Sequence, residues 1–354
     1  MSLLFQPLRV RDAEMRNRLW VAPMCQYSAT DGMPEEWHHV HLAQFASGGA
    51  GLVLTEATAV TPDGRISPGD VGLWNDAQRD AWEPIVAAIT RRGAVAGIQL
   101  AHAGRKASTF SPFGDGHGSI PVAEGGWPTL APSAVAYEGL AEPRALTLTE
   151  IDGIVAAFGA AAIRAVQAEF RVIEIHAAHG YLVHQFLSPL SNQRTDEYGG
   201  TRENRARLLL RIVDAVRAAS ADVAVFVRFS ATDWAPGGWD VDDTAQAAAW
   251  ASAHGADFFD ISSGGLVAHQ RIEVAPGYQV PFARRVREGG LAVSAVGMID
   301  TGADAERVLA DGDADAVMSA REWLRDPHFA LRAATELGAD PALWPPQYAR
   351  ARRR

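Results

Sequence analysis

Two histidines and a tyrosine stand close together in the segment His176-Ala-Ala-His179-Gly-Tyr181. The histidines are three residues apart and follow an apolar run that predicts a strand. Such a pair suits either of two chemistries, because imidazoles bind zinc and also donate hydrogen bonds to a carbonyl or anionic oxygen. The Tyr181 phenol can give a proton to a carbanion formed beside it. Both chemistries stay open at this point, although no convincing carboxylate or thiolate third metal ligand is evident.

A second group of residues suits a phosphate-bearing ligand. Gly297 lets the backbone approach a ligand closely, and Arg321 offers a bidentate guanidinium. The segment Thr301–Asp304 is expected to begin a helix, whose amino end favours an anion. Arg228 and Gln99 are expected to face the same opening and to hydrogen-bond a polar ring system. The alternative is that these side chains form ordinary ion pairs at strand ends.

A third cluster, His38, His39 and His41, lies on a predicted helix and invites a metal site. We favour the simpler interpretation that this helix face packs against a barrel or a partner subunit.

Short apolar runs that predict strands alternate along the chain with longer amphipathic segments that predict helices. The expected strands are Leu19–Met24, Gly51–Glu56, Val95–Leu100, Val172–His176, Val223–Phe229, Phe258–Ser262, Ala292–Val296 and Ala316–Ser319. The expected helices are Glu36–Ala46, Ala77–Arg92, Thr149–Glu169, Arg202–Ala218, Asp243–His254, Pro281–Arg287, Ala303–Ala310 and Pro327–Leu337. Thr149 and Thr201 are the expected helix-start residues.

About eight such units in one chain of 354 residues predict an α/β fold, a (β/α)8 TIM barrel formed by a single domain over residues 1–354. A doubly wound sheet is the rival fold, but no Gly-x-Gly-x-x-Gly follows the first strand. Two long connections, 101–148 and 177–200, predict extended loops at the carboxyl ends of the strands, where barrel enzymes place their sites. The side chains expected at this mouth are Met24, Cys25, Tyr27, Glu56, Ala57, Gln99, His102, Arg105, Lys106, His176, His179, Tyr181, Arg228, Ser262, Ser263, Gly297 and Arg321.

The overall composition narrows the class of protein. The net charge is −10 with no basic face, so we expect no nucleic-acid partner. The single cysteine, Cys25, cannot form an internal disulfide, and neither a signal peptide nor a membrane-spanning stretch is evident. We therefore expect a soluble, cytoplasmic protein with no membrane partner.

Several separated motifs match one family of barrel enzymes. They are Asn17-Arg18, Ala22-Pro-Met-Cys-Gln-Tyr27, Thr55-Glu-Ala57, Gln99-Leu-Ala-His-Ala-Gly-Arg-Lys106, Glu174-Ile-His-Ala-Ala-His-Gly-Tyr181, Gln185-Phe-Leu-Ser-Pro189 and Asn192-Gln-Arg-Thr-Asp-Glu-Tyr-Gly-Gly200. By these motifs the chain resembles the old yellow enzyme family, nearly end to end, in its short bacterial branch known as thermophilic-like or xenobiotic-reductase-like.

The resemblance implies an FMN-dependent NAD(P)H oxidoreductase, an ene-reductase with non-covalent FMN and with NADPH or NADH as reductant. The expected substrates are small activated alkenes and quinones: enones, enals, maleimides and quinones. The resemblance assigns the isoalloxazine and ribityl chain to Pro23, Met24, Cys25, Ala57, Gln99 and Arg228, and the phosphate to Gly297, Ala320 and Arg321. It assigns the substrate oxygen to His176 and His179, proton donation to Tyr181, the other pocket wall to Tyr27 and flavin tuning to Cys25.

The resemblance also implies a homodimer or homotetramer, in which the tail from about residue 338 to 354 contacts a neighbouring subunit and places Arg350 in that subunit's site. Two features depart from the family pattern: Ala320 stands where glycine is frequent, and the 101–148 connection, with Phe110, Phe113 and Trp127, is long. One cysteine leaves no room for the four-cysteine cluster of the longer family members. A metal-dependent barrel hydrolase and a non-catalytic flavin-binding protein are the alternatives.

Overall fold

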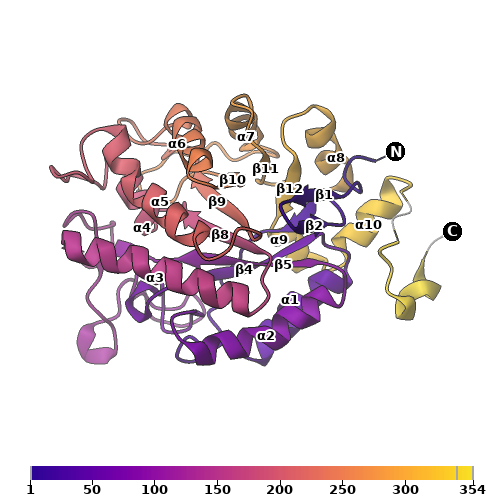
Figure 1. Ribbon diagram of the computed structural model, residues 1–354, viewed down its shortest axis with the longest axis horizontal. Coiled ribbons are helices and arrows are strands. Elements are labelled where there is room, and N and C mark those ends of the chain that lie inside the picture. Colours follow the sequence, from indigo (N-terminus) through magenta and orange to yellow (C-terminus); the bar gives the residue numbers. More distant parts are fainter. Residues whose placement is uncertain (1, 340–341, 353–354) are drawn as a thin grey trace.

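The computed structural model describes residues 2–339 and 342–352, and eight parallel strands in it close into a barrel (Figure 1). In order around the barrel they are β3 Leu19–Val21, β4 Leu52–Ala59, β5 Val95–Ala101, β8 Val172–Ala177, β9 Ala224–Ser230, β10 Phe258–Ser262, β11 Val293–Ala295 and β12 Ala316–Ser319. All eight pairings are parallel. The predicted α/β class and (β/α)8 barrel are confirmed.

The first barrel strand is shorter than expected. It ends at Val21 instead of Met24, after the Ala22 N–H donates one more hydrogen bond to the Ser319 carbonyl. Pro23 follows, and a proline has no N–H with which to continue the ladder. The segment from Pro23 to Tyr27 therefore leaves the barrel wall as irregular chain over the mouth.

Helices cover the outside of the barrel. They are α1 Glu36–Ser47, α2 Asp76–Thr90, α3 Leu148–Gln167, α5 Arg202–Arg217, α6 Val241–Ala253, α7 Val280–Arg287, α8 Gly302–Ala310 and α10 Phe329–Glu336, with two short ones, α4 Leu182–Leu187 and α9 Arg321–Arg325, that the sequence pattern did not predict. Thr201 caps α5 as expected, since its hydroxyl accepts from Asn204 N–H. The expected start at Thr149 is wrong: Thr147 caps α3, in a reciprocal capping box with Glu150.

Apolar side chains pack on both faces of the barrel strands. Leu, Ile, Val and Ala side chains fill the space between strands and helices, while Trp20, Phe226 and Phe258 pack together inside the barrel. Their ring centroids are 4.6 Å apart for Phe226 and Phe258 and 5.2 Å for Trp20 and Phe258. This interior packing resembles the layered side chains of other TIM barrels, whose sites lie at the carboxyl ends of the strands.

The two ends of the barrel differ. A hairpin of β1 Leu8–Val10 and β2 Ala13–Met15 packs on the interior aromatic cluster and closes the amino-terminal end, at the right of Figure 1. At the other end lie α4 and the long connection 101–148, which carries the short strand pair β6 Leu130–Ala131 and β7 Arg144–Ala145. The predicted extended loops thus lie at the carboxyl ends of the strands.

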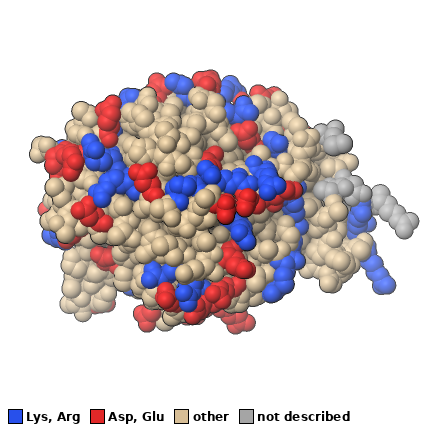
Figure 2. Space-filling view, in the orientation of Figure 1, with Lys and Arg blue, Asp and Glu red and all other residues tan. Residues whose placement is uncertain are grey.

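Acidic and basic side chains are mixed on the face shown in Figure 2. In the part of the chain that the structure describes, no helix is long and apolar enough to cross a membrane.

Candidate active site

His176, His179 and Tyr181 meet at the carboxyl end of β8. The His176 ring lies edge to face with both neighbours, at centroid distances of 5.2 Å to His179 and 5.0 Å to Tyr181. The His179 Nε2 atom lies 2.9 Å from Ser262 Oγ at the end of β10. The structure therefore brings the three predicted side chains together.

The electrostatic surroundings keep both imidazoles neutral. Burial, assisted by the positive charge of Arg228, lowers the pKa of His176 and of His179 well below the ordinary value. Burial, with the nearby Cys25 thiol group as a smaller cause, raises the pKa of Tyr181 well above 10. Near neutral pH each imidazole thus donates from one ring nitrogen, and Tyr181 keeps its proton. These are the protonation states that two oxygen-binding donors and one acid require.

Small side chains form a floor beside Tyr181. Ala57, Ala101, Ala103 and Ala107 cluster with Ile66, and the side chains of Cys25, Tyr27 and Tyr181 pack against them. These small apolar side chains give the site a low, apolar floor beside Tyr181. Burial raises the pKa of Cys25 well above its ordinary value, so this side chain is a thiol and not a nucleophilic thiolate.

The segment that carries Cys25 and Tyr27 is held by β4 and α1. The Gln26 N–H donates to Glu56 Oε2 at 3.0 Å, and Glu56 Oε1 lies 3.3 Å from His38 Nε2. His38 is buried, so it faces the barrel as the packing interpretation expected. Among the described residues, no group of three or more His, Cys, Asp or Glu side chains is arranged to hold a metal ion.

Gln99 and Arg228 lie in the barrel interior directly below the mouth. Strand register places Gln99 beside Glu174 and Arg228 beside Asp260, and the Gln99 amide donates to Glu174 Oε1 at 2.7 Å. Arg228 Nε lies 2.9 Å from Asp260 Oδ2. Both acidic partners fall inside apolar strand runs, so the sequence pattern did not predict these contacts. Glu174 Oε2 and His176 Nδ1 are buried and have no hydrogen-bond partner among the residues that the structure describes, so both atoms can bind a polar group of a ligand.

The predicted phosphate residues line a cavity of about 140 Å³ at the ends of β11 and β12. Gly297 and Ala320 contribute backbone, and the exposed Arg321 guanidinium forms no ion pair with any described residue. Gly297 has φ +122°, and a Cβ there would lie 2.8 Å from the Gln279 amide, so this position requires glycine. Ala320 has a negative φ of −115°, so alanine replaces the frequent glycine without entering the left-handed region that requires one.

These features fit FMN. The free cation and the glycine at the β11–β12 end suit its phosphate, and the alanine floor suits its ring. The buried atoms Glu174 Oε2 and His176 Nδ1, which have no partner among the described residues, suit polar groups of the cofactor or substrate.

Three further basic side chains that were expected at the mouth form hydrogen bonds with backbone groups of nearby loops. His102 Nδ1 accepts from Gly104 N–H, and the Arg105 guanidinium donates to the carbonyl groups of Val135 and Leu266. Lys106 Nζ donates to the His179 carbonyl at 2.9 Å. His102 and Arg105 thus hold loops, whereas Lys106 supports the histidine pair directly.

Arg350 lies in a short helix, Pro346–Ala351, which follows the last barrel strand by more than 20 residues. The neighbouring Tyr348 lines a cavity of about 580 Å³ together with Arg16, which follows β2, and with Arg91 and Arg92, which follow α2. The expected role of Arg350 in a neighbouring subunit stays a prediction.

Comparison with known proteins identifies the family. The model of the NADH:flavin oxidoreductase / NADH oxidase family matches residues 3–340. An NADPH dehydrogenase of Listeria welshimeri is 46% identical over 355 residues, which cover 99% of both chains. The structure of morphinone reductase superposes with a TM-score of 0.80 at 29% identity, covering 97% of this chain and 93% of the other. The old yellow enzyme homologue of Zymomonas mobilis gives 0.78 at 28% identity, with 97% of each chain covered.

The family match spans nearly the whole chain, and the relatives agree with the barrel and with the expected cofactor. The chain therefore belongs to the NADH:flavin oxidoreductase / NADH oxidase family and is an FMN-dependent oxidoreductase of the old yellow enzyme type.

Proposed function

We propose that this protein is an ene-reductase that uses NADPH to reduce the activated C=C bond of α,β-unsaturated carbonyl compounds. The observation that carries the proposal is the contact of two neutral imidazoles and one protonated phenol beside the alanine floor. Support for NADPH comes from relatives named NADPH dehydrogenase that are 46% identical over 99% of the chain. NADH is the alternative reductant.

The residues that line the site are the proposed contacts of the cofactor. Pro23, Met24, Cys25, Ala57, Gln99 and Arg228 would surround the isoalloxazine and ribityl chain, while Gly297, Ala320 and Arg321 would hold the phosphate. Bound there, FMN would supply the hydride chemistry between the nicotinamide and the β-carbon of the substrate.

The protein's own groups then act on the substrate. His176 and His179 each donate a hydrogen bond to the carbonyl oxygen and stabilise the negative charge that develops there as the enolate forms. Tyr181 gives its phenolic proton to the α-carbon and leaves the saturated carbonyl product. Tyr27 lines the opposite wall, with the Cys25 thiol beside the cofactor ring to tune its potential.

The long connection limits the substrate from above. The Phe113 ring lies edge to face with Tyr27 at a centroid distance of 5.7 Å, although Phe113 is 75% exposed. Small enones, enals, maleimides and quinones would fit beneath this pair, and substituents that push against Phe113 would raise KM.

Cyclohexenone, cyclohexanone and N-ethylmaleimide distinguish the candidate functions. The purified protein is expected to be yellow, and its NADPH oxidation under anaerobic conditions is expected to accelerate with cyclohexenone and maleimide but not with cyclohexanone. Flavin without any acceleration by enones would favour a flavin-binding protein of another kind. Stoichiometric zinc without flavin absorbance would favour a metal-dependent hydrolase.

A further inference from the structure

His179 and Gly180 form a left-handed turn between β8 and α4. Their φ angles are +57° and +74°. Glycine adopts this region freely, whereas histidine adopts it in a minority of cases, so surrounding contacts help to hold His179 there. The direction of the His179 side chain, and the entry of the chain into Tyr181, both depend on this turn.

Side chains form hydrogen bonds with all four backbone polar groups of the turn. The His179 N–H donates to Ser230 Oγ at 2.9 Å, and the His179 carbonyl accepts from Lys106 Nζ at 2.9 Å. The Gly180 N–H donates to His184 Nδ1 at 2.9 Å, and the Gly180 carbonyl accepts from Gln185 Nε2 at 2.7 Å. The backbone of Gly265 closes over the turn as well, since a Cβ on Gly180 would lie 2.2 Å from the Gly265 carbonyl oxygen.

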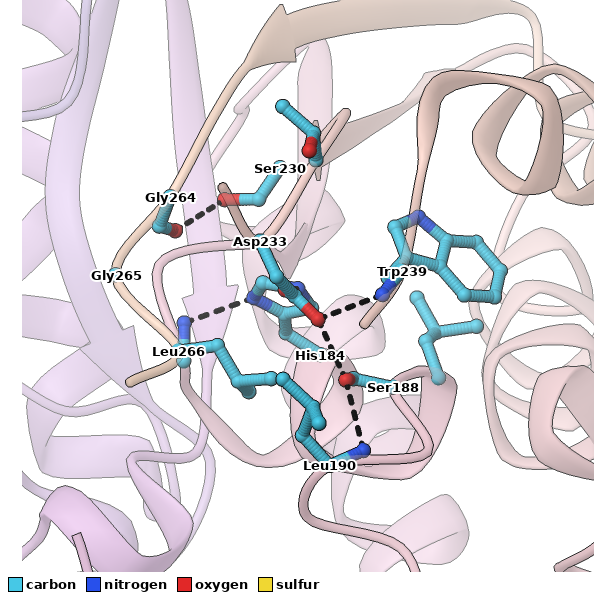
Figure 3. A network of polar contacts seen from close by, with 12 residues as sticks. His184, Ser188, Leu190, Ser230, Asp233, Trp239, Gly264, Gly265 and Leu266 are labelled. Carbon is cyan, nitrogen blue, oxygen red and sulfur yellow. Dashed lines mark hydrogen bonds and ion pairs between the residues drawn. The ribbon is translucent and has the colours of Figure 1, made fainter. Parts of the chain in front are cut away.

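One of these side chains, His184, connects the turn to a buried acid (Figure 3). His184 Nε2 lies 2.9 Å from Asp233 Oδ1, and both side chains are fully buried. Because Nδ1 accepts a hydrogen bond from Gly180, the ring proton of a neutral His184 must be on Nε2, where it faces the carboxylate. Asp233 therefore selects the tautomer that can hold Gly180.

The other oxygen of Asp233 is committed elsewhere. Oδ2 accepts from Ser188 Oγ at 2.6 Å and from the Trp239 N–H at 2.7 Å (Figure 3). Burial alone would raise the pKa of Asp233, but the contacts with His184, Ser188 and Trp239 lower it below the ordinary value. Asp233 is thus a carboxylate, and its orientation is fixed from two sides.

We propose that Asp233 and His184 are positioning residues that hold the His179–Gly180 turn and thereby aim His179 at the substrate oxygen. The proposal rests on the ene-reductase function proposed above. Among the described residues, the side chains of Asp233 and His184 form hydrogen bonds or ion pairs with Gly180, Ser188, Trp239 and each other, and with none of the predicted cofactor or substrate groups, so they act through the turn. The consequence is confined to the step in which charge develops on the substrate oxygen, because reduction of the flavin by NADPH needs no polarised carbonyl.

The isosteric change Asp233→Asn tests the tautomer argument. Ser188 and Trp239 both need an acceptor, so the asparagine carbonyl is expected to face them and its NH2 group to face His184. His184 would then accept at Nε2 and carry its proton on Nδ1, where it opposes the Gly180 N–H. A change that only removed a charge would not break this hydrogen bond.

The rates of the two half-reactions and the hydrogen exchange of the peptide 177–182 are measured in FMN-loaded enzyme. For Asp233→Asn we expect reoxidation by cyclohexenone at least about tenfold slower, NADPH reduction within about twofold of wild type, and faster exchange at the Gly180 amide. His184→Asn offers an Oδ1 acceptor near the Nδ1 position without reaching Asp233. In that background, Asp233→Asn is expected to change reoxidation less than threefold.

Two controls separate positioning from general loss of stability. Asp214→Asn alters an exposed Asp–His pair with His254 between α5 and α6, and Val216→Ala removes buried methyl groups from α5. We expect neither change to alter the rate of either half-reaction. Val216→Ala shows how a lowered Tm by itself affects these rates. If Asp233→Asn does not fold, His184→Gln, which lacks an acceptor at the Nδ1 position, is measured in the same way.

Two results for Asp233→Asn would overturn the proposal. One is reoxidation within twofold of wild type with unchanged exchange at the Gly180 amide. The other is an equal loss of rate in both half-reactions when the Tm of Asp233→Asn is no lower than that of Val216→Ala. If wild-type enzyme itself is not reoxidised by enones, the ene-reductase function fails. The exchange rate of the Gly180 amide then still decides whether Asp233 holds the turn.

Discussion

The phenol ring of Tyr181 meets the imidazole of His176 edge to face, with centroids 5.0 Å apart and 72° between the ring planes. His176 belongs to β8 and Tyr181 directly precedes α4, so the left-handed turn between them folds the phenol back over the strand end. Under the proposed function, one substrate can therefore meet an oxygen-binding donor and an acid at the same time.

Tyr181→Phe removes the proposed acid. We expect flavin reduction by NADPH close to wild type and reoxidation by cyclohexenone slower by about 10²- to 10⁴-fold, the usual contribution of a positioned general acid. Anaerobic stopped-flow absorbance measures both rates. Tyr198→Phe is the matched control, because the Tyr198 hydroxyl contacts Arg211 in the outer layer. An unchanged reoxidation rate in Tyr181→Phe would mean that the proton comes from elsewhere.

Arg321→Ala removes the free cation of the proposed phosphate site. Hydrogen bonds to charged groups contribute about 1.5–3 kcal/mol, so the Kd for FMN should rise about ten- to a hundredfold. Fluorescence titration of apoprotein with FMN measures this change. Arg325→Ala is the control, since that guanidinium already pairs with Glu322 and Asp300. Equal FMN affinity of wild type and Arg321→Ala would place the phosphate elsewhere.

Much of this arrangement could be predicted from the sequence, because continuous apolar runs mark buried parallel strands and the catalytic side chains follow them directly. The contacts beneath the site could not be predicted. Asp260 and Glu174 lie inside strand runs, and only the barrel register shows that they meet Arg228 and Gln99. The contact between Asp233 and His184 could not be predicted for a similar reason, since the two residues are 49 positions apart in sequence and only the fold brings them together.

The first strand and α4 show a second limit. Apolar character continued through Met24, but Pro23 ended the strand, and the six-residue helix α4 is too short for its periodicity to be recognised.

Arg350→Ala tests the predicted contribution of the tail to a neighbouring site. We expect a raised KM for enones with full retention of FMN, together with a dimer or tetramer by light scattering. Arg9→Ala, on the β1–β2 hairpin, alters an exposed arginine and is the control. A monomer with unchanged KM in Arg350→Ala would contradict the shared site.

The stability of the protein should depend on pH through Asp70. Burial raises the pKa of this carboxyl from 3.8 to about 7, while it accepts hydrogen bonds from Ile66 N–H and Ser67 Oγ. The folded state thus holds this proton to a higher pH than the unfolded state does. The stabilisation is complete below about pH 4 and is lost as the pH rises through 7.

Asp70→Asn cannot titrate, so its free energy of unfolding relative to wild type should increase between pH 4.5 and 8, by at most about 4 kcal/mol. Urea unfolding at several pH values measures the difference. Asp12→Asn, at an exposed position, should show no such trend. A constant difference between Asp70→Asn and wild type would show that Asp70 ionises normally in the folded protein.

The most direct test of the central claim is anaerobic reoxidation of the NADPH-reduced enzyme by cyclohexenone. We predict return of the oxidised flavin spectrum with stoichiometric formation of cyclohexanone, at a rate that His176→Ala and Tyr181→Phe each lower. A flavin that NADPH reduces but that cyclohexenone leaves reduced, with no cyclohexanone formed, would contradict the account.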